Sequence, residues 1–519
     1  MQNQFVRDSM KIGCLLTLAF VALSLGAPEL YGQEPITHKV PCGSIRIGVT
    51  SMNNSNRGVG GDCAPLEAAQ LLADLNRAQP RVTVTSVVSE KSSPSTAAVT
   101  LEVLSTTSSS QRTASGAYDL HLFRDGQVVR LWPMVLDAGS DQELRANFAS
   151  EISTWRRRHL ISLVDGKKVI TFHGVPLPQR KDVKSVIFTA YAFNSDRVKS
   201  ATSPPFEYQL PVPRANTPRR AYVITVGVNA NESHFNLEMA VPSAQRAGLL
   251  LAGELRNDYS EIHPIALYSN LAEDSAQVVV KNARKANLKA VLDLLAGRPI
   301  SPRLRKLVDP DHVVRSATPD DAVVLYVASH GYMDPHGTFF LFPYDTGTSW
   351  GVSEASLSRC EIQMSRSAQC SKEEMFLEQS ISSMELANWW SGIDAGELDM
   401  ILDTCHSGAA PGKGFRAAPL GDPGLGQLSY DKRMRIVVAA QPAQTDRGEW
   451  IGGEGGRTLL VEALDGAKTS YPDAGMSEWF IRATRLAPLT EAKRYPDMKL
   501  EDVQAPQLLD FSKYQDQNE

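Results

Sequence analysis

Residues 398–408 read LDMILDTCHSG and residues 321–331 read DAVVLYVASHG, and these two stretches decide the fold. Each is an apolar run that stops at a reactive residue followed by small residues, which is typical of a buried parallel strand that ends in a turn. In open α/β sheets, sites form outside the carboxyl ends of such strands. His330 and Cys405 are therefore expected to meet at one edge of a sheet, where an imidazole can take the proton of a thiol nucleophile.

In this order and context, the Ser-His-Gly and Asp-Thr-Cys-His-Ser-Gly strings resemble those of the caspase-like cysteine peptidases, and more closely the metacaspase and bacterial caspase-like branch. Animal caspases instead carry Gln-Ala-Cys-x-Gly at the nucleophile. The resemblance covers about residues 219–512, and its closing stretch Gln504–Phe511 matches a pattern that often ends bacterial caspase-like domains. It implies a caspase-like α/β domain, with a mostly parallel central sheet flanked by helices, and a cysteine-type endopeptidase.

The resemblance implies Cys405 as the nucleophile and His330 as its acid-base partner, with the backbone N–H groups of Gly331 and Cys405 forming the oxyanion hole. Taken alone, a Cys after an apolar strand is more often an inert buried thiol, and a lone His is usually structural. Two nearby histidines are weaker candidates: His336 lies in a loop, and His406 points away from its neighbour along an extended chain.

Asp403 lies two residues before Cys405, so both side chains are expected on the same side of the strand. In metacaspases the aspartate at this position lines the pocket for the residue before the cut, where it favours Arg or Lys. A buried, hydrogen-bonded strand-end aspartate is the alternative. Bacterial relatives commonly read Asn-Asp-Ala in the first helix, where this chain has Ser243 in place of the acid. Asp446 and Glu449, after the next strand, are candidates to compensate for it.

The first 32 residues are typical of a secretory signal peptide. Arg7 and Lys11 precede an apolar stretch from Ile12 to Leu25, which is short for a membrane span. We expect cleavage after Gly32 and export to the periplasm or the extracellular space; an uncleaved anchor is the alternative. No later segment is long and apolar enough to span a bilayer.

Six cysteines are present in the chain. Cleavage of the signal peptide would remove Cys14, and Cys405 is the expected nucleophile. The other four cysteines form two pairs that are close in sequence: Cys42 with Cys63, and Cys360 with Cys370. Even, locally paired cysteines in an exported chain predict two disulfides. Four free thiols are the alternative.

Short runs that alternate apolar and polar residues fill the region from 97 to 210, with turn signals between them, which predicts an all-β, immunoglobulin-like sandwich. Its expected role is that of an accessory or substrate-positioning module, or of a plain spacer. The Ser/Pro-rich stretch 89–96 is interpreted as a linker. The predicted domains are a signal peptide (1–32), a poorly defined region (33–96), the sandwich (97–210), a Pro-rich linker (211–218), the caspase-like domain (219–512) and a tail (513–519).

Beyond residue 219, apolar strands alternate with helical patterns, which predicts parallel βαβ units. Besides the two strands that end at His330 and Cys405, the expected strands are 221–228, 262–268 and 434–440, and the expected helices are 240–255, 278–295, 383–390 and 457–464.

The formal net charge of -5 gives no electrostatic reason to expect a nucleic acid as partner. The expected partner is a protein or peptide substrate, and nothing in the sequence assigns an oligomeric state. We expect no cofactor: no His/Cys/Glu cluster has metal-ligand spacing, and no acidic cluster allows a calcium ion to be placed, although some relatives require calcium. The run Gly452–Gly456 lacks the ending of a phosphate loop and is interpreted as a flexible substrate-side loop.

The segment from Gly408 to Arg433 is rich in Gly and Pro, which predicts an exposed loop. Caspase-like enzymes are often cut in this segment, and exposed loops are readily nicked. Lys413, Arg416, Lys432 and Arg433 are therefore candidate self-processing sites, with an uncut surface loop as the alternative.

Together, these features predict an exported cysteine endopeptidase that cuts after Arg or Lys. Two other functions fit the same residues: a catalytically silent binding or scaffold protein, and a thiol acyl-transferase (transpeptidase) on the same fold.

Overall fold

The computed structural model describes residues 40–41, 62–63, 76–91, 93–107, 114–133, 148–211, 218–232, 236–271, 278–333, 338–346, 377–404, 425–440, 456–499 and 503–512. The chain forms two compact units, residues 1–47 with 51–75, and residues 48–50 with 76–519. In the first unit, strands β1 (Val40–Pro41) and β2 (Asp62–Cys63) pair antiparallel, with Val40 opposite Cys63. The other described elements belong to the second unit.

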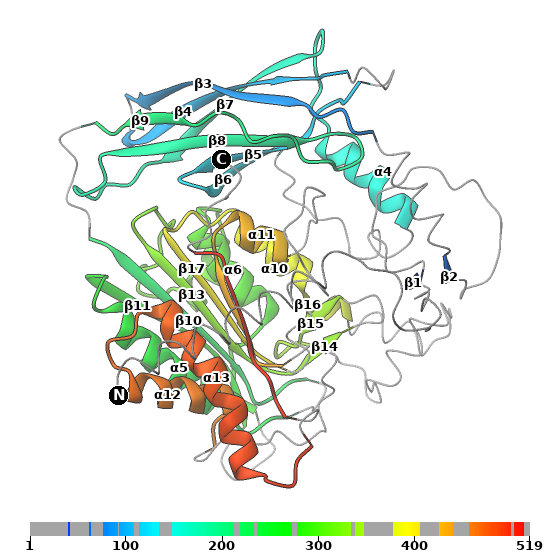
Figure 1. Cartoon of the computed structure of the whole chain (residues 1–519). Helices are drawn as coiled ribbons and strands as arrows, with labels where there is room; N and C mark the ends of the chain where they lie inside the picture. Colours follow the sequence, from blue (N-terminus) through cyan, green and yellow to red (C-terminus); the bar gives the residue numbers. More distant parts are fainter. Residues whose placement is uncertain are drawn as a thin grey trace, which may run out of the picture. The chain divides into compact units, whose positions relative to one another are not determined.

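A seven-stranded sheet forms the centre of the α/β domain (Figure 1). Its strands, in order across the sheet, are β12 (Val278–Lys281), β11 (Glu261–Leu271), β10 (Arg220–Val228), β13 (Ala322–Ala328), β17 (Glu397–Asp403), β18 (Arg435–Val438) and β19 (Gln507–Asp510). The five inner strands are parallel, and the edge strands β12 and β19 run antiparallel to their neighbours. The predicted mostly parallel sheet is confirmed.

The strand order changes direction at β10, because β11 lies on one side of it while β13, β17 and β18 follow on the other. Such a reversal opens a crevice at the carboxyl ends of the strands beside it. Strand β13 is buried along its whole length, and β17 along all but its first residue. Such burial suits these two strands because helices cover both faces of a parallel sheet.

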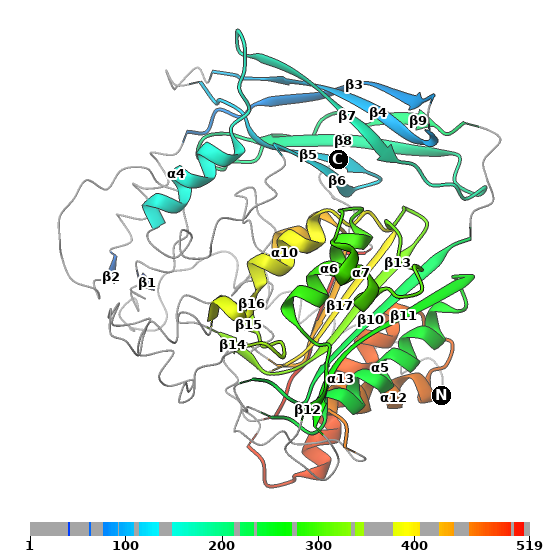
Figure 2. The same cartoon turned by 180° about the vertical axis from the view of Figure 1, so that it is seen from behind.

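Helices pack on both faces of the central sheet (Figure 2). One face is covered by α5 (Ala240–Leu255), α12 (Leu459–Ser470) and α13 (Met476–Arg494). The other face is covered by α6 (Lys285–Leu295), α7 (Pro302–Val308), α10 (Ser383–Ser391) and α11 (Leu425–Asp431).

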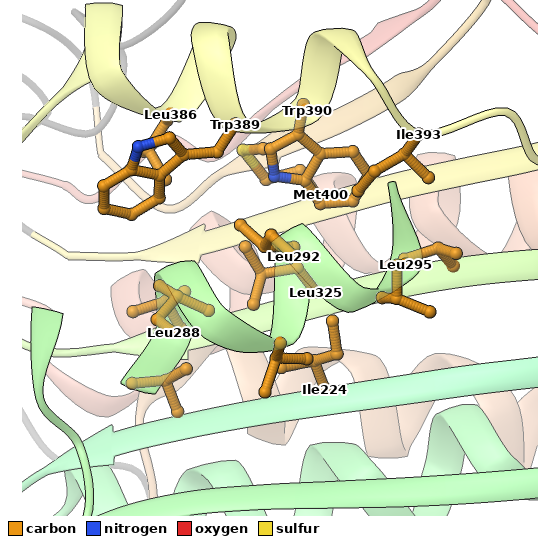
Figure 3. Packing of buried hydrophobic residues seen from close by; sticks show 14 of the residues in the cluster. Ile224, Leu288, Leu292, Leu295, Leu325, Leu386, Trp389, Trp390, Ile393 and Met400 are labelled. Carbon is orange, nitrogen blue, oxygen red and sulfur yellow. The ribbon is translucent and has the colours of Figure 1, made fainter. Parts of the chain in front are cut away.

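Large apolar side chains fill the core on the α6 side (Figure 3). Leu292 and Leu295 of α6 and Trp390 of α10 pack with Leu325 of β13 and Met400 of β17. Burying an apolar side chain of this size stabilises a fold by roughly 1.5–3 kcal/mol. This packing fixes β13 and β17 in the middle of the sheet, and with them the ends of both strands.

The predicted helix 278–295 is wrong in its first part, because Val278–Lys281 form strand β12 and α6 begins only at Lys285. The run of three valines favours a strand, since branched side chains lose rotamer freedom in a helix. The sequence patterns also do not predict α7, α13, or a small antiparallel sheet of three strands: β14 (Gly331–Met333), β15 (Phe339–Leu341) and β16 (Ile381–Ser382).

The β-rich region consists of two antiparallel sheets that share one core. Leu101 and Val103 of one sheet pack in the same cluster as Leu122 and Phe188 of the other. The first sheet orders β3 (Arg81–Glu90), β4 (Ser93–Leu104) and β7 (Lys167–Pro176); the second orders β6 (Gln127–Trp132), β5 (Tyr118–Arg124), β8 (Ser185–Phe193) and β9 (Phe206–Gln209); helix α4 (Phe148–His159) follows β6. We call this region the sandwich; its immunoglobulin-like character stays a prediction.

The predicted start of the sandwich at residue 97 is wrong, as is the predicted linker at 89–96. Strand β3 begins at Arg81 and pairs with β4 along its length, so 89–96 contains the turn of a hairpin. A register shift between Val84 and Ser86 breaks the simple alternation of β3. Such a bulge places two residues opposite one, and this hides the period of two on which strand prediction depends.

Hydrogen bonds and an ion pair attach the sandwich to the residues that precede the central strands, at the amino ends of these strands. Arg124 of β5 forms a two-point ion pair with Asp394 (Nη2–Oδ1 2.8 Å, Nη1–Oδ2 3.2 Å), and both side chains are buried. The Gln127 side-chain amide donates to the carbonyl oxygens of Ala395 (2.7 Å) and Lys432 (3.2 Å). Asp394 and Ala395 precede β17, and Lys432 precedes β18. The sandwich therefore contacts the edge of the sheet opposite to the strands' carboxyl ends.

A second buried contact joins Tyr191 of β8 to Asp431, whose two carboxylate oxygens accept from the tyrosine hydroxyl at 3.0 Å each. His121 lies between Asp431 (3.4 Å) and Asp119 (3.2 Å). Burial lowers the pKa of His121, but the charge and hydrogen bond of Asp119, together with Asp431, outweigh it and raise this pKa to about 10. These bonds attach the sandwich at the amino ends of the strands, and its role as an accessory module or as a spacer stays a prediction.

Candidate active site

The carboxyl ends of β13 and β17 lie side by side in the centre of the sheet. In their parallel pairing, Ala328 is opposite Asp403, and both are the last residues of their strands. His330 follows Ala328 by two residues, and Thr404 is the next residue after Asp403. The predicted His330 and the end of the strand that leads to Cys405 are thus at the same level of the sheet.

His330 is positioned through its backbone and its neighbours. Its carbonyl oxygen accepts a hydrogen bond from the Phe342 N–H (3.1 Å), and the hydroxyl of buried Ser329 donates to the Phe342 carbonyl. The imidazole lies beside the Phe342 ring, with 6.5 Å between centroids. Directly after His330 the chain enters β14, where Gly331 pairs with Leu341. This small sheet turns the chain away from β13 and leaves His330 and Gly331 half-buried.

Asp403 is buried completely. Its Oδ2 accepts hydrogen bonds from the Tyr326 hydroxyl (2.5 Å) and from the Thr458 hydroxyl, whereas its Oδ1 has no hydrogen-bond partner in the described chain. Burial raises the pKa of Asp403 to about 6, although the bonds from Thr458 and Tyr326 act in the opposite direction. The side chain is therefore a carboxylate at neutral pH, with one oxygen saturated and the other unpaired.

Ser243 lies in the first turn of α5 and is buried. Its Oγ accepts a hydrogen bond from the Thr458 N–H (2.8 Å). Thr458 is the N-cap of α12, and its hydroxyl is bonded to Asp403. The structure thus joins Ser243 to Asp403 through one residue.

Other predicted site residues lie outside the described part of the chain, and the predictions on them stay open. They are the nucleophile Cys405, the pocket candidates Asp446 and Glu449, the processing candidates Lys413 and Arg416, the alternative histidines His336 and His406, and the disulfide candidates Cys42, Cys360 and Cys370.

The predicted exposed loop that ends at Arg433 is wrong in its last part. Leu425–Asp431 form helix α11, and Lys432 is fully buried, with its amino group donating to the Ile393 carbonyl (2.7 Å). Burial disfavours the charged form and lowers the pKa of Lys432 to about 8. The half-buried Arg433 follows directly. A protease needs an exposed, extended segment, so neither residue is placed as a processing site requires.

Within the described residues, no group of three or more His, Cys, Asp or Glu side chains is placed to hold a metal ion. In the same part of the chain, no helix is long and apolar enough to cross a membrane.

Comparisons with known proteins add little to this geometry. No family model matches the chain, and no curated protein matches it. Among solved structures, the crystal structure of caspase-1 from Spodoptera frugiperda is similar over 58% of this chain and 93% of that chain, with 12% sequence identity and a TM-score of 0.28. A TM-score this low carries no argument.

Two residues of the site, Tyr326 and Thr458, are not predicted from the sequence. Tyr326 lies inside an otherwise apolar strand, and its hydroxyl is the one polar group that the run DAVVLYVA buries in its second half. Thr458 is the second residue of the predicted helix 457–464, and threonine is a residue type preferred at N-caps, the position that it takes at the start of α12. Both signals are visible in the sequence, but neither indicates that the two hydroxyls converge on Asp403.

Proposed function

We propose that this protein is a cysteine endopeptidase in which Cys405 is the nucleophile and His330 its proton acceptor. One observation carries the proposal: the parallel register of β13 and β17, in which Ala328 lies opposite Asp403. It places His330 at the same edge of the sheet as the strand that leads directly to the thiol.

The covalent chain limits how far Cys405 can lie from this edge. Cys405 follows Thr404 directly, and consecutive Cα atoms are about 3.8 Å apart. Neighbouring strands lie about 4.8 Å apart. The proposal therefore expects the Cys405 thiol and the His330 imidazole to lie within side-chain reach of each other.

These residue types suit acyl transfer from a peptide bond. His330 accepts the proton of the Cys405 thiol, and the thiolate attacks the carbonyl carbon. The negative charge that develops on the carbonyl oxygen needs N–H donors, for which the backbone of Gly331 and Cys405 are our candidates. His330 then gives its proton to the leaving amine, and water hydrolyses the thioester.

We further propose that Asp403 selects Arg or Lys before the cut, with Asp446 and Glu449 as additional candidates. The support is the buried carboxylate itself, since its described neighbours offer hydroxyls and no cation. An unpaired buried charge is costly, so a substrate side chain that neutralises it is strongly preferred over one that does not.

The test is a panel of peptides that differ only in the residue before the cut. We expect cleavage after Arg and Lys, and a loss of about a thousand-fold or more for Cys405→Ala and for His330→Ala, because the two act as one unit. The matched control is His173→Ala, an exposed histidine of the sandwich, which should keep full activity. Full activity of Cys405→Ala on any cleaved peptide would overturn the proposal.

A further inference from the structure

We propose that Tyr326 and Thr458 are positioning residues that saturate one oxygen of Asp403 and thereby present the other to a cationic side chain. This inference rests on the proposed function, because it concerns the same substrate pocket. In this proposal, three residues from β13, β17 and α12 together select the cation, and Asp403 does not do so alone.

The geometry of the cluster is asymmetric. The Tyr326 hydroxyl comes from β13, the neighbouring strand, and the Thr458 hydroxyl from the N-cap of α12. Both donate to Oδ2, and all three residues are fully buried. A carboxylate has about four lone-pair sites on its two oxygens, so Oδ1 keeps its full accepting capacity.

A third contact fixes Thr458 in this position. The Oγ of Ser243, in the first turn of α5, accepts the Thr458 N–H at 2.8 Å. The Ser243 hydroxyl thus holds the orientation of Thr458. A second carboxylate at this place would face Asp403 across one side chain, and like charges there would be costly.

The unpaired Oδ1 indicates the chemistry of the ligand. A buried acceptor without a partner costs roughly 1–3 kcal/mol, and more when it is charged. A guanidinium or ammonium group supplies both the missing donor and the missing charge, whereas a neutral amide supplies only the donor. Since the groups that act on Asp403 in the described chain are the hydroxyls of Tyr326 and Thr458, no internal cation there competes for this place.

The two hydroxyls also decide when the carboxyl is ionised. Hydrogen bonds donated to a carboxylate favour its charged form, which opposes the effect of burial. Without the Tyr326 hydroxyl, Asp403 should hold its proton to a higher pH. Binding of a cation, which needs the carboxylate, should then begin at a correspondingly higher pH.

The test uses two readouts on the full chain. The first is the pH profile of kcat/KM for a peptide with Arg before the cut. The second is binding of benzamidine to the Cys405→Ala protein by calorimetry, which does not depend on catalysis. For Tyr326→Phe we expect the acidic midpoint in both readouts to move up by about one pH unit, the equivalent of one hydrogen bond to a charged group.

Two sets of controls separate positioning from folding. Tyr259→Phe removes a tyrosine hydroxyl from Glu397, at the amino end of the same strand β17, and should leave both midpoints unchanged. Thr458→Val should act like Tyr326→Phe, and Thr458→Ser should restore the midpoint because it keeps the hydroxyl. Asp403→Asn should abolish the pH step in benzamidine binding.

The outcomes distinguish this inference from the proposed function. If benzamidine binds with the expected shifts but no peptide is cleaved, the proposed function fails and the cation site stands. If Arg peptides are cleaved but Tyr326→Phe, folded as judged by its melting temperature, keeps the wild-type midpoint, the inference fails and the function stands. Absence of benzamidine binding overturns the inference and makes Asp403 a purely structural aspartate.

Discussion

Asp403 carries a charge in a place from which water is excluded, and this has a cost for folding. Its pKa is about 6 in the folded chain and 3.8 in an unfolded reference, so the folded state binds the proton more tightly. The free energy of unfolding therefore falls as the pH rises from about 4 to about 6, and the loss persists above that range.

Asp403→Asn should remove this cost. With about 1.4 kcal/mol for each pKa unit, we expect the variant to be more stable than the wild type by up to about 3 kcal/mol at pH 7.5, with little gain at pH 4. Urea denaturation at both pH values measures this difference. The exposed Asp473→Asn serves as control and should show no comparable gain. Equal effects of Asp403→Asn at both pH values would contradict the argument.

At this scale, the sequence predicts which residues end the strands but not what surrounds them. The spacing of two between Asp403 and Cys405 is a local property, so it is readable from the chain. The partners of Asp403 are 77 and 55 residues away in the sequence. Hydrogen bonds over such separations follow from the packing of β13, β17 and α12, which no local pattern encodes.

At the level of the elements, strand β10 packs very closely against the first turn of helix α5, which carries Ser243 of the candidate site. A Cβ on Gly227, near the end of β10, would lie 2.8 Å from the Val241 Cα and 2.9 Å from the Ala240 carbonyl oxygen. Both atoms belong to the backbone of the first turn of α5, which also carries Ser243. Only glycine lets the helix begin this close to the strand.

We expect Gly227→Ala to destabilise the protein by about 1–3 kcal/mol, because the backbone of α5 must move to relieve the overlap. A matched control exists in the same helix. Gly253 is exposed and has open space where its Cβ would lie, so Gly253→Ala should stabilise the protein by up to about 1 kcal/mol. Thermal denaturation of both variants tests the pair, and a similar effect of the two substitutions would show that the contact is not tight.

The sequence predicts best the helices and strands whose pattern of apolar residues is regular from end to end. The strand before His330 is buried throughout, and α5 has the predicted bounds 240–255. The elements that it misses carry conflicting signals. Helix α13 contains Pro488, a residue that normally interrupts a helix, and its buried face holds only Met476, Trp479, Phe480, Ala483, Ala487 and Glu491.

On the scale of the whole molecule, a buried ion pair and a buried hydrogen bond to a carboxylate join the sandwich to the α/β domain. Arg124 and Asp394 are 270 residues apart in the sequence, and Tyr191 and Asp431 are 240 apart. The sequence predicts two domains from a change of period, from two to 3.6. It gives no sign of the bonds between them, because a polar side chain in a strand is normally expected to face water.

The Arg124–Asp394 pair should make folding of the two parts cooperative. Arg124→Met or Asp394→Asn leaves one buried charge without its partner, which should cost about 3–5 kcal/mol, and the double variant should cost less than the sum. The partly exposed Lys167–Glu102 pair of the sandwich is the control, and Lys167→Met should change stability by less than about 1 kcal/mol. Chemical denaturation followed by two probes tests this. A sandwich that unfolds separately, at lower denaturant, would contradict it.

Because the sandwich is attached at the amino ends of the strands, sequence change during evolution is constrained differently at the two edges of the sheet. At the amino ends of the strands, a substitution or a change in loop length must preserve the bonds of Arg124 and Gln127, because the loss of these bonds would destabilise the fold. Strands β17 and β18 end at the opposite edge of the sheet, away from these bonds. Substitutions near the carboxyl ends of the strands can therefore accumulate without loss of the bonds between the sandwich and the α/β domain.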